Sequence, residues 1–196
     1  SRGGAAGGSH HRIIIEGARV PTEIARANPI AKAHYYATNA VRGYNFLVYL
    51  RRTSAPELRQ VFLSRDLTRI VSRRVSASED DDDVTSIRVA DVTDIMLGHK
   101  TEVFKAVRNA TRHVLKEETA FSVVSELTSL DIEAETFEYR QHWASIFAWC
   151  INELRPNGVL TTLLKAGKLT VVNQLNRNVK DEVKDRSVLQ VVISNT

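Results

Sequence analysis

The sequence contains one cysteine, Cys150, among its 196 residues. A disulfide within the chain is therefore excluded, which fits a reducing compartment. No apolar run approaches the roughly 20 residues that a helix needs to cross a bilayer. The chain opens at Ser1 without the pattern of a secretory signal. These absences favour a globular domain with an ordinary core.

The patterns that carry catalysis or bind metal ions are also missing. No two histidines have the helical spacing of a zinc enzyme, and one cysteine cannot form a structural zinc centre. A phosphate-binding loop, a dinucleotide fingerprint and a Gly-x-Ser-x-Gly motif are absent. Cys150 lies on the apolar face of a predicted helix, where a core role is expected. The sequence therefore predicts no enzyme, no metal and no cofactor.

The charge balance is mildly basic, with 27 Lys and Arg against 23 Asp and Glu and a net charge of +4. Such a balance favours anionic partners, either a membrane surface or nucleic acid. The basic residues are not interleaved with aromatic residues in the pattern of a nucleic-acid module. We therefore expect no nucleic-acid partner.

The chain divides into four predicted regions. Residues 1–20 form a glycine-rich leader that is expected to be flexible. Residues 21–41 form a helical extension, with Asn28 as the cap before Pro29. Residues 42–156 form the main domain, and residues 157–196 form a C-terminal extension with ordered segments but no recognised pattern.

Within the main domain, short strands separated by turns precede one helix. Single strands are predicted at 44–52, 59–64, 68–75, 120–125 and 129–134, and one or two strands over 84–97. Residues 103–119 fit either a helical insertion or a long basic connection. Residues 135–154 form an amphipathic helix that Thr136 caps, with Trp143 on its apolar face. This order predicts an α+β fold, a small antiparallel barrel or sandwich closed by a helix.

Two stretches of the domain carry a family resemblance. "RVADVTDIMLGHKTEVF" and "FSVVSELTSLDIEAETFEYRQHWASIFAWCINEL" resemble the pleckstrin homology (PH) domain of the delta-type phospholipases C. The Gly-His-x-Thr-Glu turn, the Phe-Ser pair, the Leu-Asp strand and the Gln-His-Trp helix follow in the same order. The resemblance implies a seven-stranded antiparallel barrel or sandwich, with Trp143 of the C-terminal helix in its open end. The layout is also similar to small acylated PH-domain proteins of apicomplexan parasites, which bind phosphatidic acid.

The polar cluster from Gly98 to Glu102 allows two interpretations, a reactive site or a turn. In the family this segment is where a strand ends. Gly98 would permit the backbone bend, and Thr101 and Glu102 would satisfy local donors. A structural turn is therefore expected.

The resemblance implies a lipid-headgroup site at the open end of the barrel. Arginine suits phosphate because its planar fork donates paired hydrogen bonds. The residues expected to contact phosphate are Arg51, Arg52, Arg59, Arg73 and Arg74, with Ser129 assisting. The two first-strand lysines of the family align with Val48 and Leu50, which shifts the expected ligand toward phosphatidic acid or general anionic lipid.

The predicted function is a non-catalytic module that binds anionic phospholipid, phosphatidic acid or a phosphoinositide, on the cytoplasmic face of a membrane. A second membrane signal would be needed, because one weak contact binds only reversibly. The alternative is a PH-like scaffold for protein partners. The acidic run 79–83 is expected to be a solvated loop, with electrostatic covering of Arg73 and Arg74 as a second possibility.

Overall fold

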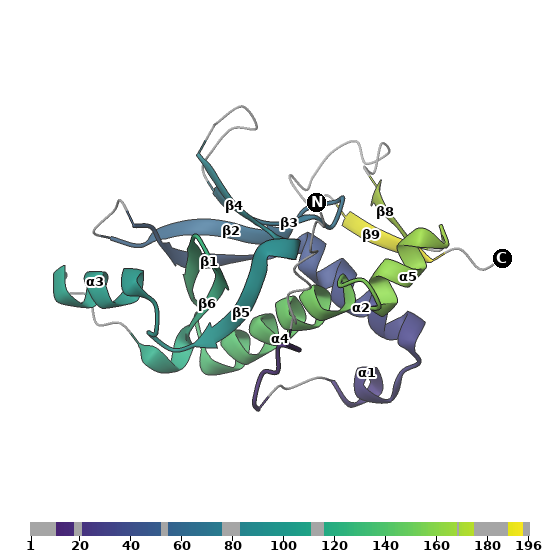
Figure 1. The fold of residues 1–196 in the computed structure, drawn as a ribbon, viewed down its shortest axis with the longest axis horizontal. Coiled ribbons are helices and arrows are strands. Elements are labelled where there is room, and N and C mark those ends of the chain that lie inside the picture. The colour runs from purple at the N-terminus through teal and green to yellow at the C-terminus, as the bar shows by residue number, and fades with distance from the viewer. Residues whose placement is uncertain are drawn as a thin grey trace, which may run out of the picture.

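The computed structural model describes residues 11–17, 21–51, 55–75, 83–110, 116–167, 169–174 and 188–193. Its centre is a seven-stranded antiparallel sheet in the order β4-β3-β2-β1-β7-β6-β5 (Figure 1). The strands are β1 (Tyr44–Tyr49), β2 (Glu57–Leu63), β3 (Arg69–Arg74), β4 (Val84–Arg88), β5 (Val92–Leu97), β6 (Ala120–Ser125) and β7 (Ser129–Glu133).

The strand count, the antiparallel pairing and the long helix after β7 confirm the expected PH-type α+β fold. The barrel, however, is not closed. β4 and β5 lie at opposite edges of the sheet and are joined by a 3-10 turn, η1 (Val89–Asp91). The segment 84–97, predicted as one or two strands, is therefore two strands with a corner between them.

Helix α4 (Phe137–Glu153) covers the concave face of the sheet. Thr136 caps it by accepting a hydrogen bond from the Tyr139 backbone nitrogen at 3.2 Å, as the sequence predicts. The Trp143 ring is 5% exposed and its centroid lies 5.8 Å from that of Phe46. This contact between helix and first strand fills the open end of the sheet.

The amphipathic pattern expected for α4 understates its burial. Gln141, Ser145 and Ala148, which do not belong to the predicted apolar face, are also buried. The reason is that α2 (Pro29–Arg42), α5 (Val159–Lys165) and residues 11–16 pack against the helix from other sides, with Gln141 Nε2 donating to the Glu16 carbonyl oxygen. Helix α4 is thus largely buried on several sides, unlike an amphipathic helix that exposes one face to solvent.

Helix α2 enters the sheet through Gly43. The Asn28 side chain accepts a hydrogen bond from the Ala31 nitrogen at 2.8 Å, which confirms the predicted cap. Gly43 has a φ of +66°, and a Cβ there would lie 2.4 Å from the Val61 carbonyl oxygen. Only glycine fits this junction, because both the backbone angle and the close approach exclude a side chain.

The C-terminal extension contains α5 and a two-stranded hairpin. The hairpin pairs β8 (Leu169–Gln174) with β9 (Val188–Ile193), and β9 lies along α2. In Figure 1 the hairpin and α5 lie on the side of the molecule opposite α3 (Glu102–Ala110). Within the ambiguous segment 103–119, the described residues form the end of α3, up to Ala110, and the 3-10 turn η2 (Glu117–Thr119), which favours the helical interpretation for this part of the segment.

The expected flexible leader needs a correction for residues 11–17. Ile13 and Ile15 are 4% and 8% exposed and belong to the main core. Apolar side chains at alternate positions gain enough from burial to hold an extended segment in place. Residues 1–10 and 18–20 lie outside the described residues, and the short helix α1 (Thr22–Arg26) follows them.

Replacing Trp143 with alanine tests the closing contact. We expect the free energy of unfolding to fall by about 3–5 kcal/mol, because a buried indole leaves a cavity that the surroundings fill only in part. Leu127→Ala is the control, since Leu127 is 96% exposed, and its effect should stay within about 0.5 kcal/mol. Urea denaturation measures both, and equal effects would contradict the packing described.

Candidate functional site

The sheet topology brings several of the predicted site residues to one end of the sheet. β1 and β3 finish there, while β2, β4 and β7 begin there. Arg51 lies two residues after Tyr49, whose partner in β7 is Asp131, two residues after Ser129. Arg74 ends β3 at the same end. We call this end of the sheet, with Arg51, Arg74 and Ser129, the mouth.

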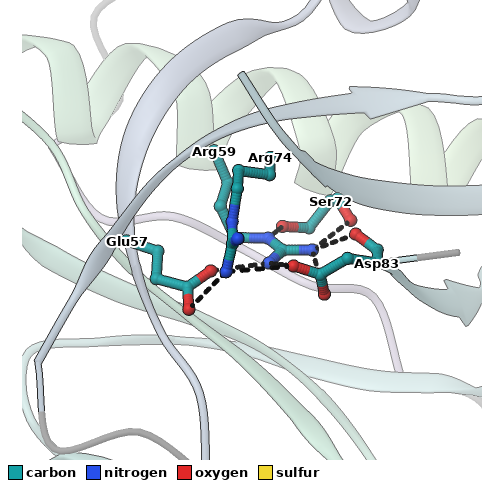
Figure 2. A network of polar contacts seen from close by, with 5 residues as sticks. All are labelled: Glu57, Arg59, Ser72, Arg74 and Asp83. Carbon is teal, nitrogen blue, oxygen red and sulfur yellow. Dashed lines mark hydrogen bonds and ion pairs between the residues drawn. The ribbon is translucent and has the colours of Figure 1, made fainter. Parts of the chain in front are cut away.

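Arg59 lies inside the mouth and is completely buried, with 0% exposure. Its Nε donates to Ser72 Oγ at 3.0 Å, and its Nη1 donates to Glu57 Oε2 at 2.9 Å and to Asp83 Oδ2 at 3.1 Å (Figure 2). Its Nη2 donates to the Ser72 and Asp83 carbonyl oxygens at 3.2 and 2.5 Å. All of the guanidinium donors therefore already bind protein acceptors.

This burial corrects the expectation for Arg59. Arg59 is expected from the sequence to contact phosphate, but a lipid headgroup cannot reach a guanidinium with no exposed surface. A buried cation is tolerated only when it is paired and fully hydrogen-bonded, and Glu57, Asp83 and Ser72 supply those partners. Arg59 thus positions the mouth and ties the start of β4 to β2 and β3.

Arg74 shares the same two carboxylates. Its Nη2 lies 3.1 Å from Glu57 Oε1 and 3.3 Å from Asp83 Oδ2. Its side chain is 45% exposed, so part of it is accessible to solvent. Figure 2 shows the two arginines and the two carboxylates converging from β2, β3 and the start of β4. The four charges sum to zero.

The remaining predicted residues differ in their surroundings. Arg73 is exposed and faces the outer side of β3, where its Nε donates to Gln60 Oε1 at 3.1 Å and its guanidinium lies 5.4 Å from the Phe62 ring centre. Arg51 is exposed in the turn after β1. Arg52 lies outside the described residues. Ser129 Oγ donates to Asp131 Oδ2 at 2.5 Å.

The acidic partners of the arginines at the mouth do not follow from the sequence pattern. Nothing in the sequence distinguishes Glu57. The acidic run 79–83 is expected to be solvated, yet Asp83 at its end pairs with Arg59 and Arg74. Residues 79–82 lie outside the described residues. One pattern in the sequence does indicate the burial of Arg59, because it alternates with Val61 and Leu63, which face the core.

The polar cluster at 98–102 forms a capped turn, as expected. Gly98 has a φ of +82°, and its nitrogen donates to the Ala120 carbonyl oxygen at 2.8 Å. Thr101 Oγ1 accepts from the Phe104 nitrogen at 3.4 Å at the start of α3. Glu102 pairs with Lys105 at 2.7 Å on the surface. The cluster therefore begins a helix and holds no arrangement of reacting groups.

Helix α3 covers two buried carboxylates on the outer face of the sheet. Asp131, with 0% exposure, accepts from Ser122 Oγ at 2.7 Å and from Thr101 Oγ1. Glu133 accepts from the Tyr49 hydroxyl, and burial together with this bond raises the pKa of Tyr49. Each carboxylate has hydroxyl donors from neighbouring strands, as a buried charge requires.

No group of three histidine, cysteine, aspartate or glutamate side chains suited to a metal ion occurs among the described residues. In that part of the chain, helices long and apolar enough to span a membrane are also absent.

Comparisons with solved structures find proteins that resemble this chain at low sequence identity. No protein-family model matches the chain, and no curated protein matches it. The Toxoplasma gondii Inner Membrane Complex sub-compartment protein 1 is 11% identical, with 64% of this chain and 98% of that chain covered at a TM-score of 0.43. S. officinalis PLC21 is 14% identical over 59% of this chain and 16% of its own, at a TM-score of 0.43.

The N-terminal PH domain of human ARAP2 is 13% identical, with 76% of this chain and 96% of that chain covered at a TM-score of 0.34. The protein has a PH-like fold by its own architecture, namely seven antiparallel strands followed by a closing helix.

Acidification tests the environment of the capped turn. The His99 ring centroid lies 4.7 Å from that of Phe104, and burial lowers the pKa of His99 below 6.5, with Glu117, Glu133 and Arg108 as nearby charges. As the pH falls through 6.5, His99 therefore takes up a proton in the unfolded chain before it does so in the folded chain. We expect the free energy of unfolding to fall as the pH drops from 7 through this region.

His99→Gln should reduce that slope, measured by urea denaturation between pH 7 and about 5. Part of the slope should remain, because burial also lowers the pKa of His142. An unchanged slope in the variant would contradict the assigned surroundings of His99.

Proposed function

We propose that this PH-like module binds the phosphate of an anionic phospholipid at the mouth, as a peripheral protein on the cytoplasmic face of a membrane. The observation that supports this most directly is the gathering of Arg51, Arg74 and Ser129 at one end of the sheet. Arg73 lies at the same end on the outer face, where it can meet a second headgroup. Arg52 belongs to the same proposal by its place after Arg51.

Arg74 is the central phosphate contact in this proposal. Its guanidinium is partly exposed and is held by Glu57 and Asp83, so its direction is fixed before a ligand arrives. A phosphate that binds Arg74 competes with Asp83, whose side chain is 37% exposed, and the fully buried Arg59 stays in place behind them. Charge-assisted hydrogen bonds of this kind contribute about 1.5–3 kcal/mol each.

Phosphatidic acid fits this mouth better than a polyphosphorylated inositol. Val48 in β1, which is fully buried, and Leu50 just after β1 stand where the family has lysines, so fewer cations face the ligand. A small phosphomonoester needs only the few arginines that are present. Protein interaction is the alternative function, and the additional segments packed around α4 favour it.

Charge reversal at the mouth tests the proposal. Vesicles that contain phosphatidic acid, phosphatidylserine or a phosphoinositide at matched total charge are sedimented with the protein. We expect strongest binding to phosphatidic acid, and a loss of at least about tenfold for Arg73→Glu/Arg74→Glu, because two charge-assisted contacts become repulsive.

The matched control is Arg69→Glu/Arg88→Glu. These exposed arginines face each other at the opposite end of β3 and β4, so the change in net charge is the same. Equal losses for the two double variants would mean that only net charge matters. No binding to any vesicle would overturn the proposal.

Asp83→Asn tests the competition between carboxylate and phosphate. The amide oxygen can still accept a hydrogen bond from Arg59, while the negative charge that opposes a phosphate is gone. We expect affinity for phosphatidic acid vesicles to rise by a few fold. Asp91→Asn is the control, because Asp91 pairs with Arg88 in an exposed ion pair at the far end of β4. Unchanged binding by Asp83→Asn would show that this carboxylate does not compete.

A further inference from the structure

Residues 11–16, which we call the arm, lie extended along α4 and are visible in Figure 1 as the dark purple segment below that helix. Ile13 and Ile15 are buried, whereas Ile14 between them is 77% exposed. This alternation is that of a β-strand. The arm nevertheless joins no sheet among the described strands, so its backbone polar groups need other partners.

Side chains of α4 supply those partners. Asn152 Oδ1 accepts from the Ile13 nitrogen at 3.0 Å, and Asn152 Nδ2 donates to the Ile13 carbonyl oxygen at 2.8 Å. Gln141 Nε2 donates to the Glu16 carbonyl oxygen at 2.7 Å. A side-chain amide that binds both groups of one residue recognises the peptide backbone itself, as a neighbouring strand would.

The rest of the contact surface suits a short peptide. Gln141 and Asn152 lie about three helical turns apart, and the small side chains of Ser145 and Ala148 lie on the same stripe between them. At one end, Arg12 Nη2 of the arm lies 3.2 Å from Glu153 Oε1. The α4 face thus pairs with the guanidinium of Arg12 and binds the backbone of Ile13, while Ile13 and Ile15 are buried in the same core cluster as α4.

The arm leaves one part of this surface unsatisfied. Gln141 is 3% exposed, and its Oε1 has no hydrogen-bond partner among the described residues. A buried amide oxygen without a donor is unfavourable. A peptide that presents an N–H to this oxygen makes a bond that the arm does not make.

We propose that the α4 face between Gln141 and Glu153 is a binding groove for an extended peptide of another protein, and that the arm is its tethered, exchangeable occupant. The peptide carries a basic residue followed by aliphatic residues one and three positions later, as Arg12, Ile13 and Ile15 do. Gly17 follows the arm with a φ of +71°, and a Cβ there would lie 2.8 Å from Gln141 Nε2.

The experiment uses the full chain and a fluorescein-labelled peptide with the sequence of residues 11–17. Binding is measured by fluorescence anisotropy to the unaltered chain, to Ile13→Asp/Ile15→Asp, and to Ile14→Asp. The double variant releases the arm, whereas the exposed Ile14 gives a matched control with the arm in place. We expect at least tenfold tighter binding of the peptide to the double variant than to the other two chains.

Asn152→Leu, added to the double variant, should abolish that binding and so assign it to α4. Three results would overturn the proposal: peptide binding to none of the chains, equal binding to all of them, or loss of cooperative unfolding in the double variant. The last result would mean that the arm is an integral part of the core and does not exchange.

Discussion

Burial of α4 is the constraint on which the rest of the structure depends. An open seven-stranded sheet leaves a wide apolar face, and one helix with Trp143 at its centre covers that face. Residues on its other sides are also buried, Gln141, Ser145 and Ala148 among them. Helices α2 and α5 and the arm cover those sides, so the segments outside the PH-type core shield the helix from water.

The structure of the mouth depends on ion pairs rather than on apolar packing. Arg59 lies where its neighbours in β2 are Val61 and Leu63, and its buried charge must be matched nearby. Glu57 and Asp83 provide the match and thereby fix the start of β4 against β2 and β3. Pairing at this position makes the surface that is offered to a ligand less basic than the sequence alone indicates.

The sequence predicted those features that local rules decide. Asn28 and Thr136 are helix caps, the strands have the expected order, and Gly98 begins a turn, because each depends on a few neighbouring residues. The open sheet edges, the carboxylate partners of Arg59 and the packing of the arm could not be predicted in this way. Each depends on residues far apart in the chain, such as Ile13 and Asn152, and a single sequence does not show which of them meet.

Glu57 and Asp83 also act as counterions that are covalently attached to the protein. When an anion meets an open basic patch, mobile salt ions leave the surface, and their release makes the affinity fall steeply with ionic strength. At this mouth an incoming anion would displace a carboxylate that stays attached to the chain. Fewer mobile ions would be released, so attraction to this end of the sheet would depend less on salt than the excess of basic residues suggests.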